Sequence, residues 1–480
     1  MNPTKLSLAS GLLALASCAV GPDYQKPTPQ VPGDWSEKAS ALDPATSRVT
    51  PQPAQVAEWW RTFRDAELTS LVDRAVQSNL DLRIAASRIR EARGLRGVSA
   101  GALLPAANAS ADYSRNRGSE NVPLPGAGVQ SNYYQAGFDA SWEIDVFGGI
   151  RRSVEAADAQ VDASVEARRD VLVTLLAEVA RNYIEVRGLQ AQIGIARQNL
   201  DAQKKTWELT RARLEAGRAA ELDVVRAQAQ VSTTASQIPV LESQRIQATH
   251  RLGVLLGREP GSLREELGGA AAIPAPPPEV PVGLPSELLR RRPDLRQAER
   301  ELAAATARVG VATADLYPKF SLTGFFALES INAGDFAKWG SRAWSVGPTI
   351  QWSIFQGGRI LAKIEVENAR QERAALLYER SILVALQEVE DALVAYSKEQ
   401  AHRAELSDSV AANVKAVDLA NQRYTQGLVD FLSVLDAQRS LYVSQDTLVQ
   451  SERQISEYLV ALYKALGGGW EMELAGESRR

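Results

Sequence analysis

The sequence holds very few of the residues from which metal centres, disulfide bonds and catalytic sites are built. Its 480 residues include one cysteine and two histidines, His250 and His402. A single cysteine cannot form a disulfide within the chain, and neither histidine belongs to a motif with metal-ligand spacing. We find no Ser/His/Asp or Cys/His motif that could position a nucleophile. We therefore expect that the chain is not an enzyme, has no catalytic residue and binds no metal.

Long apolar runs and a strong net charge are also missing. No stretch approaches the roughly 20 apolar residues that a membrane-spanning helix needs. The formal net charge is -4, which is too small to suggest a nucleic-acid partner. The triple arginine Arg290–Arg292 has no further basic cluster near it, so we interpret it as the solvated face of a helix start rather than a nucleic-acid site.

The N-terminus has the pattern of a bacterial lipoprotein signal. Lys5 precedes a short apolar run, residues 6–16, and Ser17 and Cys18 follow it. Small residues before the cysteine suit a signal peptidase, and the thiol can carry a diacylglyceryl group. We predict that residues 1–17 are a signal peptide and that Cys18 carries a covalent lipid, with no other cofactor. The alternative is an inert buried cysteine. Ala19 stands where lipoproteins of the inner membrane usually have Asp, which favours the outer membrane.

The rest of the chain is an internal duplication. Residues 61–270 form a first repeat and residues 286–468 a second. Leu82 and Leu295 match at an offset of 213, whereas Gly217 and Gly427 match at 210. The change of offset places a length difference between about 106 and 136, as expected of a loop. The remaining segments are a Pro-rich strap, a Pro-rich linker and a C-terminal tail, at 18–60, 271–285 and 469–480.

Each repeat contains two segments with the period of β-strands. We predict strands at about 106–116 and 134–147 in the first repeat and at about 320–328 and 344–355 in the second. Apolar and polar residues alternate along them, so one face of each strand is apolar and the other polar. Half of all aromatic residues fall in the segments Tyr113–Gly149 and Tyr317–Phe355. This favours a membrane β-barrel with lipid outside and water inside. The alternative is a soluble antiparallel sheet packed on a core.

Four strands cannot close a barrel, and an open edge in lipid leaves backbone groups unpaired. Three copies would supply about 12 strands, which is enough to enclose a water-filled lumen. We therefore expect a homotrimer.

The sequence of each repeat also predicts a long helical hairpin, at about 150–256 in the first repeat and at about 359–466 in the second. The first arm of each hairpin lacks proline, and apolar residues recur at every seventh position, as at Val186, Ile193 and Leu200. Each first arm would be roughly 100 Å long at about 1.5 Å per residue. The fold class is therefore a membrane β-barrel combined with an α-helical barrel. A plain coiled-coil stalk is the alternative, but it does not account for the strands.

Four motifs give the chain a family resemblance: Cys18–Tyr24, Trp59–Phe63, Gly283–Ser286 and Leu288–Leu295. In this order they resemble the outer-membrane factor family of TolC-like and OprM-like channels, in its lipoprotein branch. The resemblance implies a homotrimer with a twelve-stranded barrel and a twelve-helix tunnel, anchored by lipid in the outer membrane and extending into the periplasm. It also implies two partners, a periplasmic adaptor (membrane fusion) protein and an inner-membrane transporter of the RND type.

The function that follows is a passive, gated duct that exports small molecules such as drugs, toxic compounds or metal ions. One alternative is the exit channel of type I protein secretion, which uses the same architecture. A second alternative is a structural coiled-coil lipoprotein without a pore.

The resemblance also indicates a gate. In the family the periplasmic helix ends narrow the bore, and the matching stretch here contains Leu432 and Asp436, which share a helix face. Arg226 is the first repeat's equivalent of Asp436, so we consider a latch between Arg226 and Asp436 on adjacent hairpins. The alternative is two unpaired solvated charges.

The hairpin turns are the second predicted site. Gly217 and Arg218 form one turn, and Gly427 and Leu428 form the other. Glycine suits the left-handed residue that ends a helix. These turns resemble the tips at which adaptor hairpins meet the channel; ordinary turn chemistry is the alternative.

Overall fold

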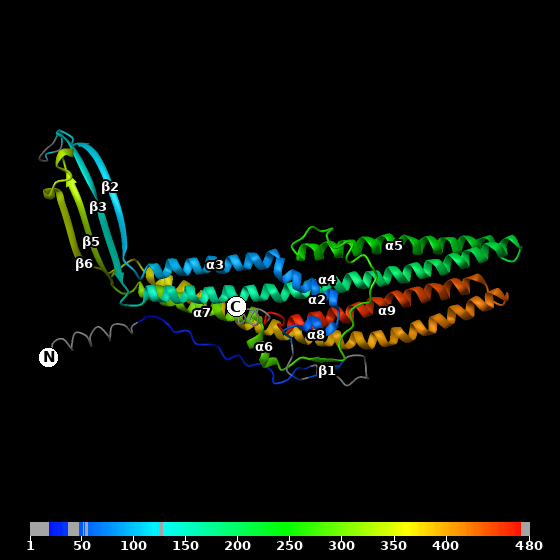
Figure 1. Cartoon of the computed structure of the whole chain (residues 1–480). Coiled ribbons are helices and arrows are strands. Elements are labelled where there is room, and N and C mark those ends of the chain that lie inside the picture. The colour runs from blue at the N-terminus through cyan, green and yellow to red at the C-terminus, as the bar shows by residue number, and fades with distance from the viewer. Residues whose placement is uncertain are drawn as a thin grey trace. The chain divides into compact units, whose positions relative to one another are not determined.

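We describe the chain from a computed structural model, which covers residues 19–36, 48–50, 52, 56–121, 123 and 128–471 (Figure 1). The predicted signal peptide, the lipidation site Cys18 and the chain beyond residue 471 lie outside the described residues. The chain divides into two compact units. The first takes Met1–Thr28, Ser87–Val165 and Gln297–Glu379, and the second takes the ranges between and after them. Each unit therefore combines parts of both repeats, so the repeats seen in the sequence are not the units of the folded chain.

The first unit contains a four-stranded antiparallel sheet. Its strands are β2 (Ala106–Arg117), β3 (Gln130–Ile144), β5 (Lys319–Ser330) and β6 (Arg342–Gln351), in the order β2-β3-β5-β6. The central pair joins the two repeats, with Phe138 opposite Phe326. Figure 1 shows β2 and β3, in blue and cyan, beside β5 and β6 in yellow-green. Strands β2 and β6 are the edges of this sheet.

Large apolar side chains of the sheet are exposed in the single chain. Phe138, Trp344 and Val346 are each 66% exposed. A water-facing sheet would hide such side chains against a core, and a contiguous exposed apolar surface marks contact with another protein or with lipid. Pro348 lies in the edge strand β6, opposite Leu322, and an edge is where a sheet tolerates proline.

Two predicted strands were wrong at their ends. β3 begins before the predicted residue 134 and stops at Ile144, short of 147. The side chain of Asp145 accepts hydrogen bonds from the backbone N–H groups of Ile150 (3.1 Å) and Arg151 (2.8 Å), which turns the chain into the following helix. β6 spans 342–351 rather than 344–355, and Gly357 and Gly358 follow with positive φ angles.

The helical hairpins lie close to their predicted ranges. α4 (Gly149–Glu215) and α8 (Arg359–Thr425) each contain 67 residues. The returning helices α5 (Glu221–Leu255) and α9 (Phe431–Ala465) each contain 35. α4 joins α5, and α8 joins α9, through the turns at the predicted glycines (Figure 1). Helices of this length present their apolar residues as a continuous stripe to their neighbours.

Further helices, which were not predicted from the sequence, precede the strands of each repeat. α2 (Ala66–Ser78) and α3 (Leu80–Gly101) precede β2, while α6 (Pro285–Arg291) and α7 (Pro293–Ala314) precede β5. Short elements complete the described chain: the 3₁₀ helices η2 (Trp59–Phe63), η3 (Ala333–Asp335) and η4 (Trp339–Ser341), and the parallel strands β1 (Arg48–Thr50) and β4 (Glu279–Pro281).

The main hydrophobic core lies in the second unit. Trp59 and Trp60 of η2 are fully buried, and the ring of Trp59 stacks on Tyr463 at 5.3 Å between centroids. Asp65 begins α2 by accepting a hydrogen bond from the N–H of Leu68 (2.9 Å), and its second carboxylate oxygen accepts one from the Tyr183 hydroxyl (2.9 Å). The tryptophan motif therefore serves packing.

The interpretation of Arg290–Arg292 as a solvated face was wrong for its last member. Arg292 is only 7% exposed, and it donates to Asp294 (2.7 Å), to Glu388 (2.6 Å) and to the carbonyl of Ala465 (3.0 Å). Burial opposes its positive charge, but the two carboxylates outweigh burial and raise its pKa above the ordinary value. A buried charge needs such partners, and one of them, Glu388, lies 96 positions away in the chain.

Within the described ranges, no helix is both long enough and apolar enough to cross a membrane.

Candidate functional site: the hairpin turns and the N-terminal strap

The two hairpin turns have the same backbone geometry. Gly217 has a φ of 69° and Gly427 a φ of 76°. The N–H of Gly217 donates to the carbonyl of Leu214 (2.9 Å), and that of Arg218 to Arg213 (2.7 Å). The second turn repeats this, with Gly427 donating to Tyr424 (3.0 Å) and Leu428 to Arg423 (2.9 Å). Both are Schellman caps, which require the left-handed conformation that glycine adopts without strain.

The turn surface is open. A Cβ atom built on Gly217 or Gly427 meets nothing within 4 Å. Arg218 is exposed, and the side chain of Leu428 is 68% exposed. The four predicted tip residues thus lie at two exposed turns. Their role as contacts for an adaptor protein stays a prediction.

Arg213 links the two hairpins, a role that the sequence pattern by itself did not indicate. Its Nη1 donates to the carbonyl of Tyr424 at 2.7 Å, and its guanidinium centre lies 4.5 Å from the centroid of the Tyr424 ring. The carbonyls in the last turn of a helix have no partner in the helix and carry its negative dipole end. Arg213 of α4 therefore stabilises the end of α8 by charge, hydrogen bond and cation–π contact. The sequence offered one indication of this role, because Arg213 of the first repeat matches Arg423 of the second.

An aromatic cluster lies beside this arginine. We call it the tip cluster. Phe431 and Tyr424 pack edge to face at 5.7 Å between centroids, and Phe431 is 1% exposed. The cluster combines residues of α4, α5, α8 and α9 with the second turn, namely Trp207, Ala227, Ala420, Tyr424, Val429, Phe431, Val434 and Leu435. It therefore fixes the first hairpin against the second within one chain.

The predicted gate residues lie on the exposed side of the same region. The side chain of Leu432 is 49% exposed, and Asp436 and Arg226 are both exposed. No ion pair joins Arg226 to Asp436 in the part of the single chain that the structure describes. Asp430 begins α9 by accepting a hydrogen bond from the N–H of Ser433 (3.2 Å). Pairing of Arg226 and Asp436 between two chains stays a prediction.

The start of the strap is fixed to the first unit by polar contacts. The N–H of Val20 donates to the carbonyl of Phe147 (3.0 Å), directly after β3. Arg152 of α4 is paired with Asp23 and with Glu155. These contacts place the residues that follow Cys18 next to the point where strand β3 gives way to helix α4.

Glu299 of α7 is the main anchor of the strap. Its Oε1 accepts a hydrogen bond from the Tyr24 hydroxyl (2.7 Å), and its Oε2 lies 3.1 Å from Nζ of Lys26. Burial opposes ionisation of Glu299, but the bonds from Tyr24, Arg300 and Lys26 outweigh burial and lower its pKa below the ordinary value. Burial and the same hydrogen bond raise the pKa of Tyr24 above its ordinary value. The carboxylate therefore stays charged and the phenol neutral at physiological pH.

A close backbone approach adds to this anchor. Gly21 has a φ of 89°, and a Cβ atom built on it would lie 2.4 Å from the Cα of Gly310 in α7. Only glycine allows both the backbone angle and the distance.

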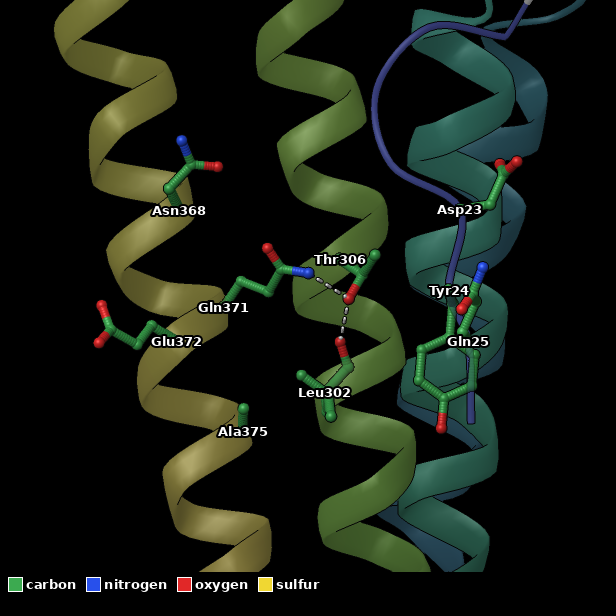
Figure 2. A pocket seen from close by; sticks show the side chains of 9 residues that line it. All are labelled: Asp23, Tyr24, Gln25, Leu302, Thr306, Asn368, Gln371, Glu372 and Ala375. Carbon is green, nitrogen blue, oxygen red and sulfur yellow. Dashed lines mark hydrogen bonds between the residues drawn. The ribbon is translucent and has the colours of Figure 1, made fainter. Parts of the chain in front are cut away.

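A cavity of about 380 Å³ opens between the strap, α7 and α8 in the first unit. Figure 2 shows Asp23, Tyr24 and Gln25 of the strap on one side and Asn368 and Glu372 of α8 on the other. Gln371 of α8 donates to Oγ1 of Thr306 in α7 (3.0 Å), which in turn donates to the carbonyl of Leu302 (3.0 Å). Most of the residues that line the cavity are polar, and two of them, Asp23 and Glu372, are carboxylates.

The described residues contain no cluster of side chains suited to binding a metal ion. Among the described residues, no group of three or more His, Cys, Asp or Glu side chains could hold a metal ion. The sequence also shows no Ser/His/Asp or Cys/His motif that could position a nucleophile. The described residues instead form an exposed apolar sheet, long paired helices and two exposed turns.

Comparison with known proteins agrees with this architecture. The family model described as outer membrane efflux protein matches residues 71–258 and 284–468. The toluene efflux pump outer membrane protein TtgF of Pseudomonas putida is 33% identical over 474 residues, covering 98% of each chain. The pyoverdine export outer membrane protein OpmQ of Pseudomonas aeruginosa is 33% identical over 485 aligned residues, covering 100% of each chain. Among solved structures, the outer-membrane channel OprN is 38% identical with a TM-score of 0.86, covering 95% of this chain and 100% of that one.

Proposed function

The chain belongs to the outer membrane efflux protein family, and we propose that it is a passive, gated, trimeric exit duct of a tripartite efflux pump. Membership of this family makes the chain an outer-membrane channel for efflux. We further propose a trimer, a closed barrel, a lipid anchor, a gate and two partner proteins.

One observation supports the proposed trimer and the proposed barrel. The sheet ends in two unpaired edge strands, β2 and β6, and carries large exposed apolar side chains. Unpaired edges in lipid are costly, and closure removes them. Three copies would provide about 12 strands, which matches a barrel wide enough for an aqueous lumen. The long helices α4 and α8, with α5 and α9, would then supply twelve helices of a tunnel.

The lipid anchor is proposed at Cys18. Support comes from the residues that follow it, because the N–H of Val20 donates a hydrogen bond to the carbonyl of Phe147, between the end of β3 and the start of α4. A lipid on Cys18 would leave the chain beside the strand–helix junction, where a barrel meets the membrane surface. The protein would then be held in the outer membrane by both the lipid and the sheet, with the tunnel in the periplasm.

The proposed partners are a periplasmic adaptor protein at the hairpin turns and an inner-membrane transporter of the RND type. The proposed cargo is small molecules, because relatives are named for the efflux of toluene and for the export of pyoverdine. Passive transport needs no catalytic residue and no cofactor. Type I protein secretion is the second candidate, since the same architecture serves it; a pore-free coiled-coil lipoprotein is the third.

Cellular retention after deletion of the gene tests the function. We expect cells that lack the chain to retain dyes, antibiotics, solvents or metal ions and to recover on re-expression. Retention of a secreted protein alone would move the assignment to secretion. Unchanged retention together with no single-channel conductance of the purified protein in a planar bilayer would refute a channel.

A further inference from the structure

We propose that the apolar face of the sheet binds a lipid of the outer leaflet whose headgroup carries phosphates. The phosphates lie at three arginines, Arg115, Arg117 and Arg342, which we call the arginine row. The acyl chains lie on the apolar side chains of the strands. This inference rests on the trimeric barrel of the proposed function and adds a ligand to its outer surface.

The arginine row lies at the end of the sheet that is farther from the helices. α3 and α7 lead into the first strand of each β-hairpin, and α4 and α8 follow the second, so all four helices join the same end of the sheet. The β2–β3 and β5–β6 connections form the opposite end (Figure 1). Arg117 is the last residue of β2 and Arg342 the first of β6. With the helical tunnel in the periplasm, this end of the sheet lies in the outer leaflet.

Arg342 lies on the apolar face of edge strand β6. Side chains two residues apart in a strand share a face, so Arg342 is on the same face as Trp344 and Val346, each of which is 66% exposed. Its guanidinium centre lies 3.8 Å from the centroid of the Trp339 ring. Tryptophan is enriched where lipid tails meet headgroups, and the arginine beside it adds a positive charge at that boundary.

Arg115 and Arg117 lie on the same face at the other edge of the sheet, strand β2. They alternate with Tyr113, which is 57% exposed and opposite Tyr134 of β3, with 4.9 Å between the ring centroids. Both arginines are exposed in the single chain. The apolar face of β2 therefore ends in two positive charges above a tyrosine.

The register of the sheet joins the two edges into one face. Tyr113 is opposite Tyr134, and Tyr134 lies four residues from Phe138 along β3, so these side chains share a face. Phe138 is opposite Phe326 of β5, which is opposite Trp344 of β6. Side chains directly opposite each other also share a face. The arginine row therefore runs along the margin of one apolar surface.

The height of the row matches the position of lipid headgroups. Near the helices, the indole N–H groups of Trp142 and Trp352 donate to backbone carbonyls, at 2.9 Å and 3.0 Å. Arg342 lies ten positions from Trp352, and Arg115 is opposite Asn132, which lies ten positions from Trp142. Ten residues at about 3.3 Å each, in strands tilted by about 40°, rise by about 25 Å, the height of the apolar band of a membrane barrel.

The charges of the arginine row are available to a ligand. Among the described residues, Arg115 donates to the neutral Gln130 (2.9 Å), and Arg342 forms no ion pair. Arg117 lies 2.6 Å from Glu120, but both side chains are more than half exposed, and such a pair contributes little. Guanidinium groups bind phosphate through two parallel hydrogen bonds. Positive charge above an apolar band thus complements an amphiphile with a phosphorylated headgroup.

Closure of the barrel completes the site. β2 and β6 are the two edge strands, so in a ring of three copies β6 of one copy pairs with β2 of the next. Arg342 of one copy then lies at the same end of the seam as Arg115 and Arg117 of its neighbour. Each seam gathers three arginines from two chains, and the trimer has three such sites.

Native mass spectrometry of the purified full-length protein tests the site, with lipid A, a glycolipid that carries two phosphates, as the probe. We expect up to three lipid A molecules per trimer and weaker binding of its monophosphorylated form, which has the same acyl chains. Arg342→Gln and Arg115→Gln/Arg117→Gln should each weaken binding about tenfold or more, as loss of charge-assisted hydrogen bonds does. Arg342→Lys keeps the charge and should retain more binding than Arg342→Gln.

Lys319→Gln is the matched control. Lys319 is 50% exposed at the helix end of β5, so loss of its charge should leave lipid binding unchanged. Equal binding by the parent and the arginine variants, or equal binding of the two forms of lipid A, would overturn the inference. A protein that copurifies on the parent trimer and is lost from the arginine variants would overturn the choice of a lipid. A monomer in the same spectra would contradict the proposed trimer, whereas a conducting trimer that binds no lipid A would overturn this inference alone.

Discussion

Tyr24 donates its hydroxyl hydrogen to Oε1 of Glu299 at 2.7 Å, which ties the start of the N-terminal strap to α7. The two residues are 275 positions apart in the chain. The bond joins a segment that directly follows the predicted lipidation site to the helix that leads into β5.

The first prediction concerns this bond. Tyr24→Phe removes the donor and leaves Oε1 of the nearly buried Glu299 carboxylate with fewer partners. We expect the strap to open more often, so that the backbone amides of residues 20–26 exchange hydrogen for deuterium faster. Time courses of hydrogen–deuterium exchange, read by mass spectrometry, measure the rate. Tyr113→Phe, at a 57% exposed tyrosine of β2, is the control and should leave the rate unchanged. Equal rates in Tyr24→Phe and the parent protein would contradict the role of this bond.

The second prediction concerns pH. The pKa of Glu299 is lower in the folded chain than its ordinary value, so the unfolded chain binds the proton more readily. Its stabilising contribution is therefore present above the unfolded pKa of about 4.3 and is lost as the pH falls through the folded value. Thermal unfolding between pH 7 and pH 3 should show a steeper loss of Tm in the parent than in Glu299→Gln. The idea fails if the two pH profiles run parallel.

A third prediction uses two glycines of the strap. Gly21→Ala combines a positive φ with a Cβ 2.4 Å from the Cα of Gly310, so we expect a loss of about 1–3 kcal/mol or more. Gly33→Ala is the matched control, because a Cβ there meets nothing within 4 Å and its φ is not positive. Denaturation midpoints of the two variants give the comparison. A loss of stability at Gly33 as large as at Gly21 would refute the close packing of the strap.

A fourth prediction separates the tip cluster from the gate. Phe431→Ala empties a site that is 1% exposed, and such a truncation costs about 3–5 kcal/mol. Its neighbour Leu432 is 49% exposed, so Leu432→Ala should cost less than about 1 kcal/mol. Thermal unfolding measures both. Bilayer leak adds the functional readout, and we expect Leu432→Ala to raise it without loss of Tm. Similar costs for the two variants would contradict the tip cluster.

The fifth prediction concerns the adaptor contact. Leu428 is 68% exposed at the second turn, so Leu428→Glu should leave folding and trimer assembly intact. If the turn docks an adaptor, the charge should abolish export in cells while bilayer conductance of the purified protein persists. Val129→Glu, at a 61% exposed residue of the β2–β3 connection, is the control and should export normally. Normal export in Leu428→Glu would refute the docking role.

Local patterns in the sequence determined much of the fold. Alternation with period two identified the strands, and proline-free heptads identified α4 and α8, because both patterns report which face of one element is apolar. Gly217 and Gly427 marked the helix ends, since a left-handed cap depends on the backbone freedom of a single residue. The internal duplication and the ordered motifs were enough to indicate the family.

Only the tertiary structure decided how distant segments meet. The pairing of β3 with β5 divides the chain into units that cut across the repeats. The burial of Arg292, the anchoring of Tyr24 on Glu299 and the capping of α8 by Arg213 each join residues far apart in sequence. Periodicity reports the environment of one face and carries no information about which partner lies across it. Arginine, tyrosine and glutamate are common on solvated helix faces, so their long-range contacts become visible only when the helices are packed together.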